Sequence, residues 1–555
     1  MNDTKNGRSV LEAAMLDRTT VCELNDDFTL PDYMPQIGRV ISVEGCAAPP
    51  SRYVGAGVAE FAGAVRYRLL YEGLGEGENT SGGGEKNGGT WCAELVSEYD
   101  AQMKPDTTDG TAGDGGEFRG DLSDVVTVAE AAAENVTARV TAPRRVTIRC
   151  RVRVHGRMLG QKEYDCTVRG SAPEEGIRRL DGTAKNGVTV GGTSEPITLH
   201  DTVTNDEMPA GGSGEIRVIG SRGEVFVSDV VNNAEGADCR GEICLSLLLC
   251  REGEGERPFR ITRKIPITST VAYDTAFPEG TQPVGVRAWG ECTSVTAAVE
   301  ENAVVCEASA VLCAEARGVR EMNYIRDVYS CDVICEAARR KIKLSRPVAC
   351  FNGNVTVSGG ADLKELGGDG GMKLTDIRAS VMPDPALTAD GEGNVTVSGK
   401  IKCTVLLEDG TELEAKEFEI PYRYAAEVPE LRSAVRAGEL PVLSARVTAG
   451  QCRGRIDAGR ISADCELSVA AAVMSESEVS AVSEISYGSA RRGAGGEPRC
   501  PARLTVCYPA SGETLWSVAK RYGADVRTIA EDNGIDSALA PDSAATLSGV
   551  DFLII

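Results

Sequence analysis

Much of the chain alternates apolar and polar residues with the period of two that is typical of β-strands. Residues 146–154 read Val-Thr-Ile-Arg-Cys-Arg-Val-Arg-Val, and comparable alternation recurs at 304–312 and 461–469. Glycine is frequent, with 63 residues, and long helical periodicity is lacking before the C-terminal region. These patterns predict a mainly β chain of many strands joined by glycine-rich turns.

Two strand-like segments recur in step along the chain. One lies at 63–71, 241–249 and 399–407, and the other at 146–154, 304–312 and 461–469, with spacings close to 160–180 residues. A weaker similarity links 186–190 to 352–357. The agreement of independent segments predicts one β-rich unit present three times.

These repeats and the composition shifts around them suggest a domain layout. We expect an N-terminal polar or helical segment at 1–19, β-rich units at 20–180, 181–345 and 346–490, a glycine-rich linker at 491–502 and a terminal module at 503–555. Polar, glycine-rich stretches inside the units, such as 73–89 and 106–120, are expected to be surface loops. A calcium loop is not expected at 106–117, because the residue order that such loops require is missing.

The terminal module has the pattern of a small α+β unit. The apolar residues Leu515, Val518, Ala519 and Tyr522 follow helical spacing. Thr514 is placed to cap that helix and Gly523 to end it, while Asp525 can cap a second short helix. Apolar stretches at 504–508 and 552–555 are expected to be strands, so the order is βααβ.

The run from Gly512 to Gly523, with Val526, Ile529, Asn533 and Ile535 after it, resembles a LysM module. This family binds N-acetylglucosamine polymers or, in some members, other proteins. The resemblance implies a binding groove between the loop before the first helix and the loop after the second. The implied groove residues are Ser511, Gly512, Glu513, Thr514, Leu515, Trp516, Asn533, Gly534, Ile535 and Asp536. The alternative is that these residues only cap and connect the helices.

Charge and histidine content weigh against several functions. The chain has 83 acidic and 59 basic residues, a net charge of −24, which repels nucleic acids. It has two histidines, and we find no nucleophile elbow, zinc-protease motif or phosphate loop. We therefore expect no enzymatic activity, no catalytic residues and no cofactor.

The 19 cysteines mostly stand where alternation calls for an apolar residue. That usage predicts reduced, buried thiols in a cytosol. The spacing nearest to a metal motif is Cys331 and Cys335, but it has neither a second pair nor a nearby histidine. We expect no metal site, no signal peptide and no transmembrane helix.

A second resemblance involves the first unit. Its opening segment, 28–45, leads into the 63–71 strand and resembles the SPOCS domain of SipL-like spore-coat proteins of clostridia. This resemblance implies a non-enzymatic adaptor in endospore coat assembly, in the mother-cell cytoplasm at the forespore surface, whose LysM module docks onto a coat-scaffold ATPase. The alternative is a protein that binds peptidoglycan or N-acetylglucosamine polymers of cortex or cell wall. Neither hypothesis involves nucleic acid or membrane insertion.

Overall fold

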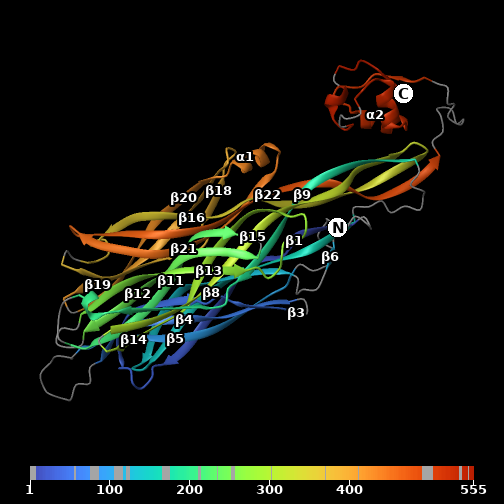
Figure 1. The fold of residues 1–555 in the computed structure, drawn as a ribbon. Coiled ribbons are helices and arrows are strands. Elements are labelled where there is room, and N and C mark those ends of the chain that lie inside the picture. The colour runs from blue at the N-terminus through green and yellow to red at the C-terminus, as the bar shows by residue number, and fades with distance from the viewer. Residues whose placement is uncertain are drawn as a thin grey trace, which may run out of the picture.

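The computed structural model consists largely of long antiparallel strands, with a small helical module at its C-terminal end (Figure 1). Strands make up 75% of the structure and helices 6%. This confirms the prediction of a mainly β chain followed by a small α+β module. The structure describes residues 8–55, 58–74, 87–105, 117–119, 125–165, 176–209, 214–233, 235–251, 257–301, 303–368, 371–410, 412–490, 504–536, 541–547 and 549–555.

Residues 8–165 form a sandwich of two antiparallel sheets. The outer sheet contains β1 (Arg8–Thr29), β6 (Glu117–Arg119), β7 (Val126–Ala142) and β8 (Arg145–Asp165). The inner sheet contains β2 (Ile37–Ala47), β3 (Ser51–Gly55), β4 (Val58–Leu74) and β5 (Asn87–Met103). Alternate residues of β4 and β8, such as Tyr67 and Ile148, are buried between the sheets. The period of two in the sequence therefore marks the residues that face this core.

Residues 177–330 form the second sandwich. Its outer sheet contains β9 (Ile177–Thr193), β10 (Ile197–Val203), β14 (Gln282–Glu300) and β15 (Ala303–Ser330). The inner sheet contains β11 (Ile216–Asn232), β12 (Gly236–Arg251) and β13 (Pro258–Ala272), and the 3-10 turn η3 (Asn205–Glu207) connects the two sheets.

Residues 333–490 form the third sandwich. Its outer sheet contains β16 (Val333–Asp362), β21 (Leu440–Asp457) and β22 (Arg460–Ala490). The inner sheet contains β17 (Lys373–Val381), β18 (Ala386–Ala389), β19 (Asn394–Asp409) and β20 (Glu412–Glu427), and α1 (Pro429–Arg436) connects β20 to β21.

The three sandwiches share one topology. In each, the first strand pairs with the last, as β1 with β8, β10 and β9 with β15, and β16 with β22. The repeated segments occupy equivalent strands, because 63–71, 241–249 and 399–407 lie in the central strands β4, β12 and β19. The other three segments lie in β8, β15 and β22. The sequence repeat thus corresponds to a repeated arrangement of paired sheets.

The beginning of the chain differs from the prediction for 1–19. From Arg8 onward this segment is the strand β1, which pairs with β8. A register shift between Ala14 and Leu16 turns two consecutive residues, Met15 and Leu16, to the buried side. The resulting spacing of apolar residues resembles that of a helix, which explains the error.

The sheets also begin earlier than the expected unit boundaries. β9 starts at Ile177, and β16 starts at Val333 and runs through the predicted boundary at 345/346. The strand pairing groups residues 8–165, 177–330 and 333–490. Only Cys331 and Asp332 separate β15 from β16, and this connection is too short to interrupt the apolar alternation in the sequence.

The three inner sheets follow one another in a closed ring. β5 contacts β11, β13 contacts β17, and β20 contacts β2, so that the third sandwich returns to the first. Arg217 donates to the Thr90 carbonyl (3.0 Å) and Arg39 to the Leu413 carbonyl (3.0 Å) across two of these junctions. Arg260 pairs with Asp376 (3.1 Å) across the remaining one.

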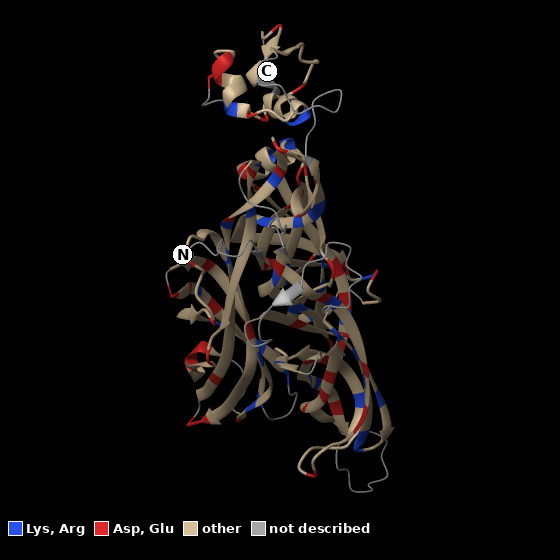
Figure 2. Ribbon diagram, turned by 90° about the vertical axis from the view of Figure 1, so that its right-hand side faces the viewer, with Lys and Arg blue, Asp and Glu red and all other residues tan. Residues whose placement is uncertain are grey.

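A cavity of about 60 Å³ lies where the inner sheets meet. Its wall includes Leu70, Leu248 and Leu406, which occupy equivalent positions in β4, β12 and β19. Each inner sheet therefore has two buried faces, one toward its own sandwich and one toward the centre of the ring. Figure 2 shows acidic and basic residues spread along the strands of this body.

Candidate functional site

The C-terminal module has the predicted βααβ order. It contains β23 (Val506–Cys507), α2 (Leu515–Tyr522), α3 (Val526–Asp532), the 3-10 turn η4 (Ala544–Leu547) and β24 (Leu553–Ile554), with β23 and β24 antiparallel. Thr514 caps α2 by accepting a hydrogen bond from the Ser517 amide (3.1 Å), and Gly523 ends the helix with a φ of 61°. Asp525 caps α3 by accepting from the amides of Arg527 and Thr528. The predicted helices and their capping residues are confirmed.

The loop before α2 is the first side of the predicted groove. Ser511 and Gly512 are exposed. Glu513 accepts a hydrogen bond from the Ala510 amide (2.9 Å) and forms an ion pair with Arg521 (2.7 Å), which ties the loop to α2. The side chains of Glu513 and Thr514 therefore shape this loop, and the exposed surface comes from Ser511 and Gly512.

The loop after α3 is the second side of the predicted groove. Asn533 donates to the carbonyls of Ile529 and Ile554 and accepts from the Ile554 amide, each at 2.7 Å. These bonds join the end of α3 to β24. Gly534, with a φ of 64°, and Asp536 are exposed, while Ile535 packs against the module's core. Asn533 thus has a structural role that the sequence pattern did not reveal.

Leu515 and Trp516 are buried and do not face the groove. Leu515 belongs to the module's own core. Trp516 turns toward β15, where its Nε1 donates to Asp327 Oδ2 (2.9 Å) and its ring meets Tyr329 edge-on at a centroid distance of 4.9 Å. Of the ten predicted groove residues, these two are therefore unavailable to a ligand in this arrangement.

Trp516 belongs to an interface between the module and the end of the second sandwich. Lys520 Nζ contacts both carboxylate oxygens of Asp327, at 2.6 and 2.8 Å, and Tyr329 donates to the Ala524 carbonyl (2.8 Å). Further ion pairs join Arg178 to Asp525 and Arg326 to Asp542. The interface fixes the face of α2 that carries Trp516 and Lys520 against the body.

Asp327 is the electrostatic centre of that interface. Burial raises its pKa, but hydrogen bonds from Lys520, Trp516 and Arg339 outweigh this effect and hold the pKa below its usual value. The carboxylate is therefore ionised at neutral pH and attracts the cation on α2. Asp327 lies 189 residues from Trp516, and no local sequence signal predicted the pairing.

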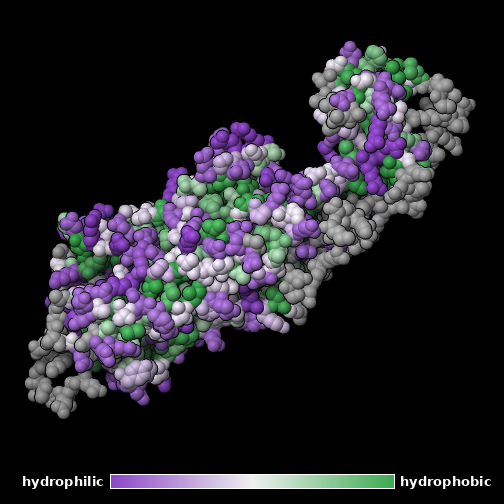
Figure 3. Space-filling model, viewed as in Figure 1, coloured by the Kyte–Doolittle hydropathy of each residue, from purple (hydrophilic) through white to green (hydrophobic). Residues whose placement is uncertain are grey.

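The module sits at one end of the elongated body (Figure 1). Figure 3 shows hydrophilic and hydrophobic residues intermixed on the body and hydrophobic residues at the outer end of the module. Leu504, Tyr508 and Phe552, which lie on or beside the small sheet, are among the exposed apolar residues. In the part of the chain that the structure describes, no helix is long and apolar enough to cross a membrane.

Comparison with known proteins agrees with the geometry of the module. No curated protein and no solved structure was found to match the chain. Residues 510–541 match the LysM domain family, and this range includes both capped helices and both loops of the predicted groove. The chain therefore carries a LysM domain at residues 510–541, which is consistent with binding of peptidoglycan or chitin-type glycans.

Proposed function

We propose that this chain is a non-enzymatic binding protein in which a rigid β body presents a LysM groove to N-acetylglucosamine-containing glycans. The observation that carries the proposal is the orientation of the LysM domain. One face of α2 is fixed to the body through Asp327 and Tyr329, while Ser511, Gly512, Gly534 and Asp536 are exposed. The body holds the domain by a surface other than the two loops.

The chemistry of the loops suits a sugar with amide and hydroxyl groups. Glu513, Thr514 and Asn533 direct their side chains to partners within the domain. A ligand would therefore meet the exposed main chain around Gly512 and Gly534. The Gly534 amide already donates to the Glu531 carbonyl (3.2 Å), so the loop before α2 would supply the N–H donors and both loops the carbonyl acceptors. An N-acetyl group and sugar hydroxyls can pair with both kinds of group, and glycine leaves the main chain accessible.

A second candidate function is that of an adaptor in endospore coat assembly. The resemblance of the first unit to SPOCS domains supports this proposal, as does the arrangement of three equivalent sandwiches joined to one LysM domain. In this case the LysM groove would dock onto a coat-scaffold ATPase. The net charge of −24 favours a partner with a basic surface, whose association should weaken with salt.

The glycan proposal is tested by measuring binding of N-acetylglucosamine oligomers and of peptidoglycan to the full chain. The variant Ser511→Arg/Asp536→Arg places bulky cations on both loops, and we expect its affinity to fall at least tenfold, or about 1.4 kcal/mol. Thr528→Arg is the matched control, because Thr528 is an exposed residue of α3 outside both loops. Failure of the full chain to bind either glycan, or equal losses in both variants, would contradict the proposal.

The adaptor candidate is tested with the same proteins. The full chain and the double-arginine variant are used as bait in a lysate of sporulating cells that contains sheared peptidoglycan. Retention of a coat-scaffold ATPase by the parent and the Thr528→Arg control, but not by Ser511→Arg/Asp536→Arg, would support protein docking. Retention of glycan without the ATPase would exclude the second candidate and keep the first.

A further inference from the structure

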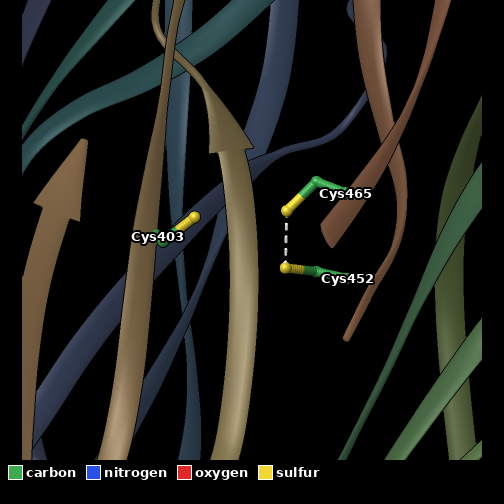
Figure 4. A group of neighbouring side chains, drawn as sticks. All are labelled: Cys403, Cys452 and Cys465. Atoms are coloured by element: carbon green, nitrogen blue, oxygen red, sulfur yellow. Dashed lines mark hydrogen bonds between the residues drawn. The ribbon is translucent and has the colours of Figure 1, made fainter. Parts of the chain in front are cut away.

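Three buried thiols meet inside the third sandwich. Cys403 lies on β19, Cys452 on β21 and Cys465 on β22, and their sulfur atoms all lie within 4.8 Å of one another. Cys452 and Cys465 are register partners whose Sγ atoms are 2.6 Å apart. Figure 4 shows the three sulfurs turned toward the same small space. The cluster therefore draws ligand atoms from both sheets of the sandwich.

The second sandwich shows how the same layer is filled without thiols. The residues at the equivalent strand positions are Leu245, Val295 and Ala308, of which Val295 and Ala308 are also register partners. All three are buried in that core. Three cysteines occupy less volume than leucine, valine and alanine together, so the third sandwich has a less filled and more polarisable layer.

We propose that Cys403, Cys452 and Cys465 bind one Cu(I) ion in a three-coordinate sulfur site that joins the two sheets of the third sandwich. Thiolate sulfur is the ligand that soft ions such as Cu(I) prefer. Structural zinc almost always takes four ligands, whereas the group that the described residues form here has three sulfurs and no histidine or carboxylate. Three thiolates satisfy Cu(I), which accepts two or three.

The spacing of the sulfurs fits an ion at their centre. A metal–sulfur bond of about 2.3 Å places the sulfurs of a three-coordinate site roughly 4 Å apart. The upper limit of 4.8 Å within the cluster leaves room for that arrangement. The closest pair, Cys452 and Cys465, reaches it by rotation about the side-chain bond between Cα and Cβ, since the opposing strands fix only the main chain.

Binding of the ion conserves charge and electrons. Cu–S bonds replace S–H bonds, the displaced protons pass to solvent, and neither copper nor sulfur changes its oxidation state. The resulting site is anionic. The guanidinium of Arg260, which is largely buried and donates to the Cys452 carbonyl (3.1 Å), lies close enough to offset part of that charge.

The test compares the full chain with a variant that takes the residues of the second sandwich, Cys403→Leu/Cys452→Val/Cys465→Ala. Both reduced proteins are titrated anaerobically with Cu(I) against a chromophoric chelator. Because the site is buried, the titration is repeated after each protein has been unfolded and refolded with Cu(I) present. We expect the parent to bind one more equivalent of Cu(I) than the variant. X-ray absorption should show three sulfur neighbours for that extra ion, and the ion should raise the parent's thermal unfolding midpoint but not the variant's.

The design separates this site from the other cysteines, which both proteins retain. Circular dichroism of the triple variant checks that it keeps its strands. If it misfolds, the single variants Cys403→Ser, Cys452→Ser and Cys465→Ser take its place: each leaves two thiolates, so it should bind the extra ion more weakly than the parent and show two sulfur neighbours instead of three. Equal copper binding by parent and variants in both protocols would overturn the proposal. So would a disulfide between Cys452 and Cys465 that persists in thiol reductant and leaves no metal-binding pair.

Discussion

Replacing Asp327 with asparagine should loosen the LysM domain from the body while leaving both parts folded. Asparagine keeps the shape of the side chain and an acceptor oxygen for Trp516 Nε1. It removes the negative charge that Lys520 and Arg339 contact at 2.6–2.8 Å. The expected change is therefore in the strength of docking rather than in the packing of β15.

The size of the effect follows from the contacts. Hydrogen bonds to charged groups contribute about 1.5–3 kcal/mol and neutral ones about 0.5–1.5, so the contact with Trp516 should lose about 1 kcal/mol. The Lys520 side chain is 36% exposed, which limits its ion pair to about 0.5 kcal/mol. Arg339 belongs to β16 of the body and adds little to docking. The total is about 1.5 kcal/mol, roughly a tenfold change in the docking equilibrium.

Two cysteines under the domain provide the assay. Cys331 and Cys335 are partly buried and pack against the core that the domain forms with Tyr329. Undocking exposes them, so their alkylation, followed by mass spectrometry of the peptides, should become up to about tenfold faster in Asp327→Asn. Cys46, which is exposed on β2, serves as the internal reference for reagent activity.

The control removes a carboxylate from an ion pair of similar length elsewhere. Glu478→Gln breaks the exposed contact between Lys341 and Glu478 (2.7 Å), which lies on β16 and β22. Alkylation of Cys331 and Cys335 should match the parent in this variant. An unchanged rate in Asp327→Asn, or an equal acceleration in both variants, would refute the assignment of Asp327 as the docking residue.

Three further outcomes are expected. Leu515→Asp places a charge in the small core of the LysM domain and should unfold it, at a cost above about 3 kcal/mol, while circular dichroism still shows the strands of the sandwiches. Asn533→Ala removes three hydrogen bonds that join α3 to β24 and should lower the domain's stability by about 2–3 kcal/mol in chemical denaturation. Burial raises the pKa of Glu224 from 4.5 to about 7, so its contribution to stability is complete below about pH 4.5 and is lost as pH rises through about 7. The free energy of unfolding of the parent should therefore be lower at about pH 8 than at about pH 5, and Glu224→Gln should reduce this difference by up to about 3 kcal/mol. An identical difference in the parent and in Glu224→Gln would contradict the assignment.

The sequence predicted those parts of the fold that depend on neighbouring residues. Capping by Thr514 and Asp525 involves amides two or three positions away, so the helices of the LysM domain could be placed from the sequence alone. The repeated strands were also predictable, because alternation reports which face of a strand is buried. The first half of β1 was assigned to the polar or helical segment 1–19 because a bulge at Met15 and Leu16 interrupts that alternation.

The interactions that join distant parts of the chain were not predictable. Trp516 was expected at the groove because the family pattern places it beside the first loop. Its partner Asp327 comes from a bulge in β15, where the register shifts between Ile325 and Asp327. Nothing in the sequence next to Trp516 or next to Asp327 indicates that the two side chains form a hydrogen bond. The cysteine cluster was missed for the same reason, because Cys403 lies on a strand that is remote in sequence from Cys452 and Cys465.

The ring formed by the three inner sheets limits how this protein can vary. In an open array of repeats, each unit contacts only its neighbours, so units can be added or lost at the ends. Here β20 of the third sandwich returns to β2 of the first. A fourth copy would have to break that junction, and a chain with two copies would leave two sheet faces unpaired. Changes in repeat number should therefore be rare among related proteins, which would diversify instead by substitution within individual units.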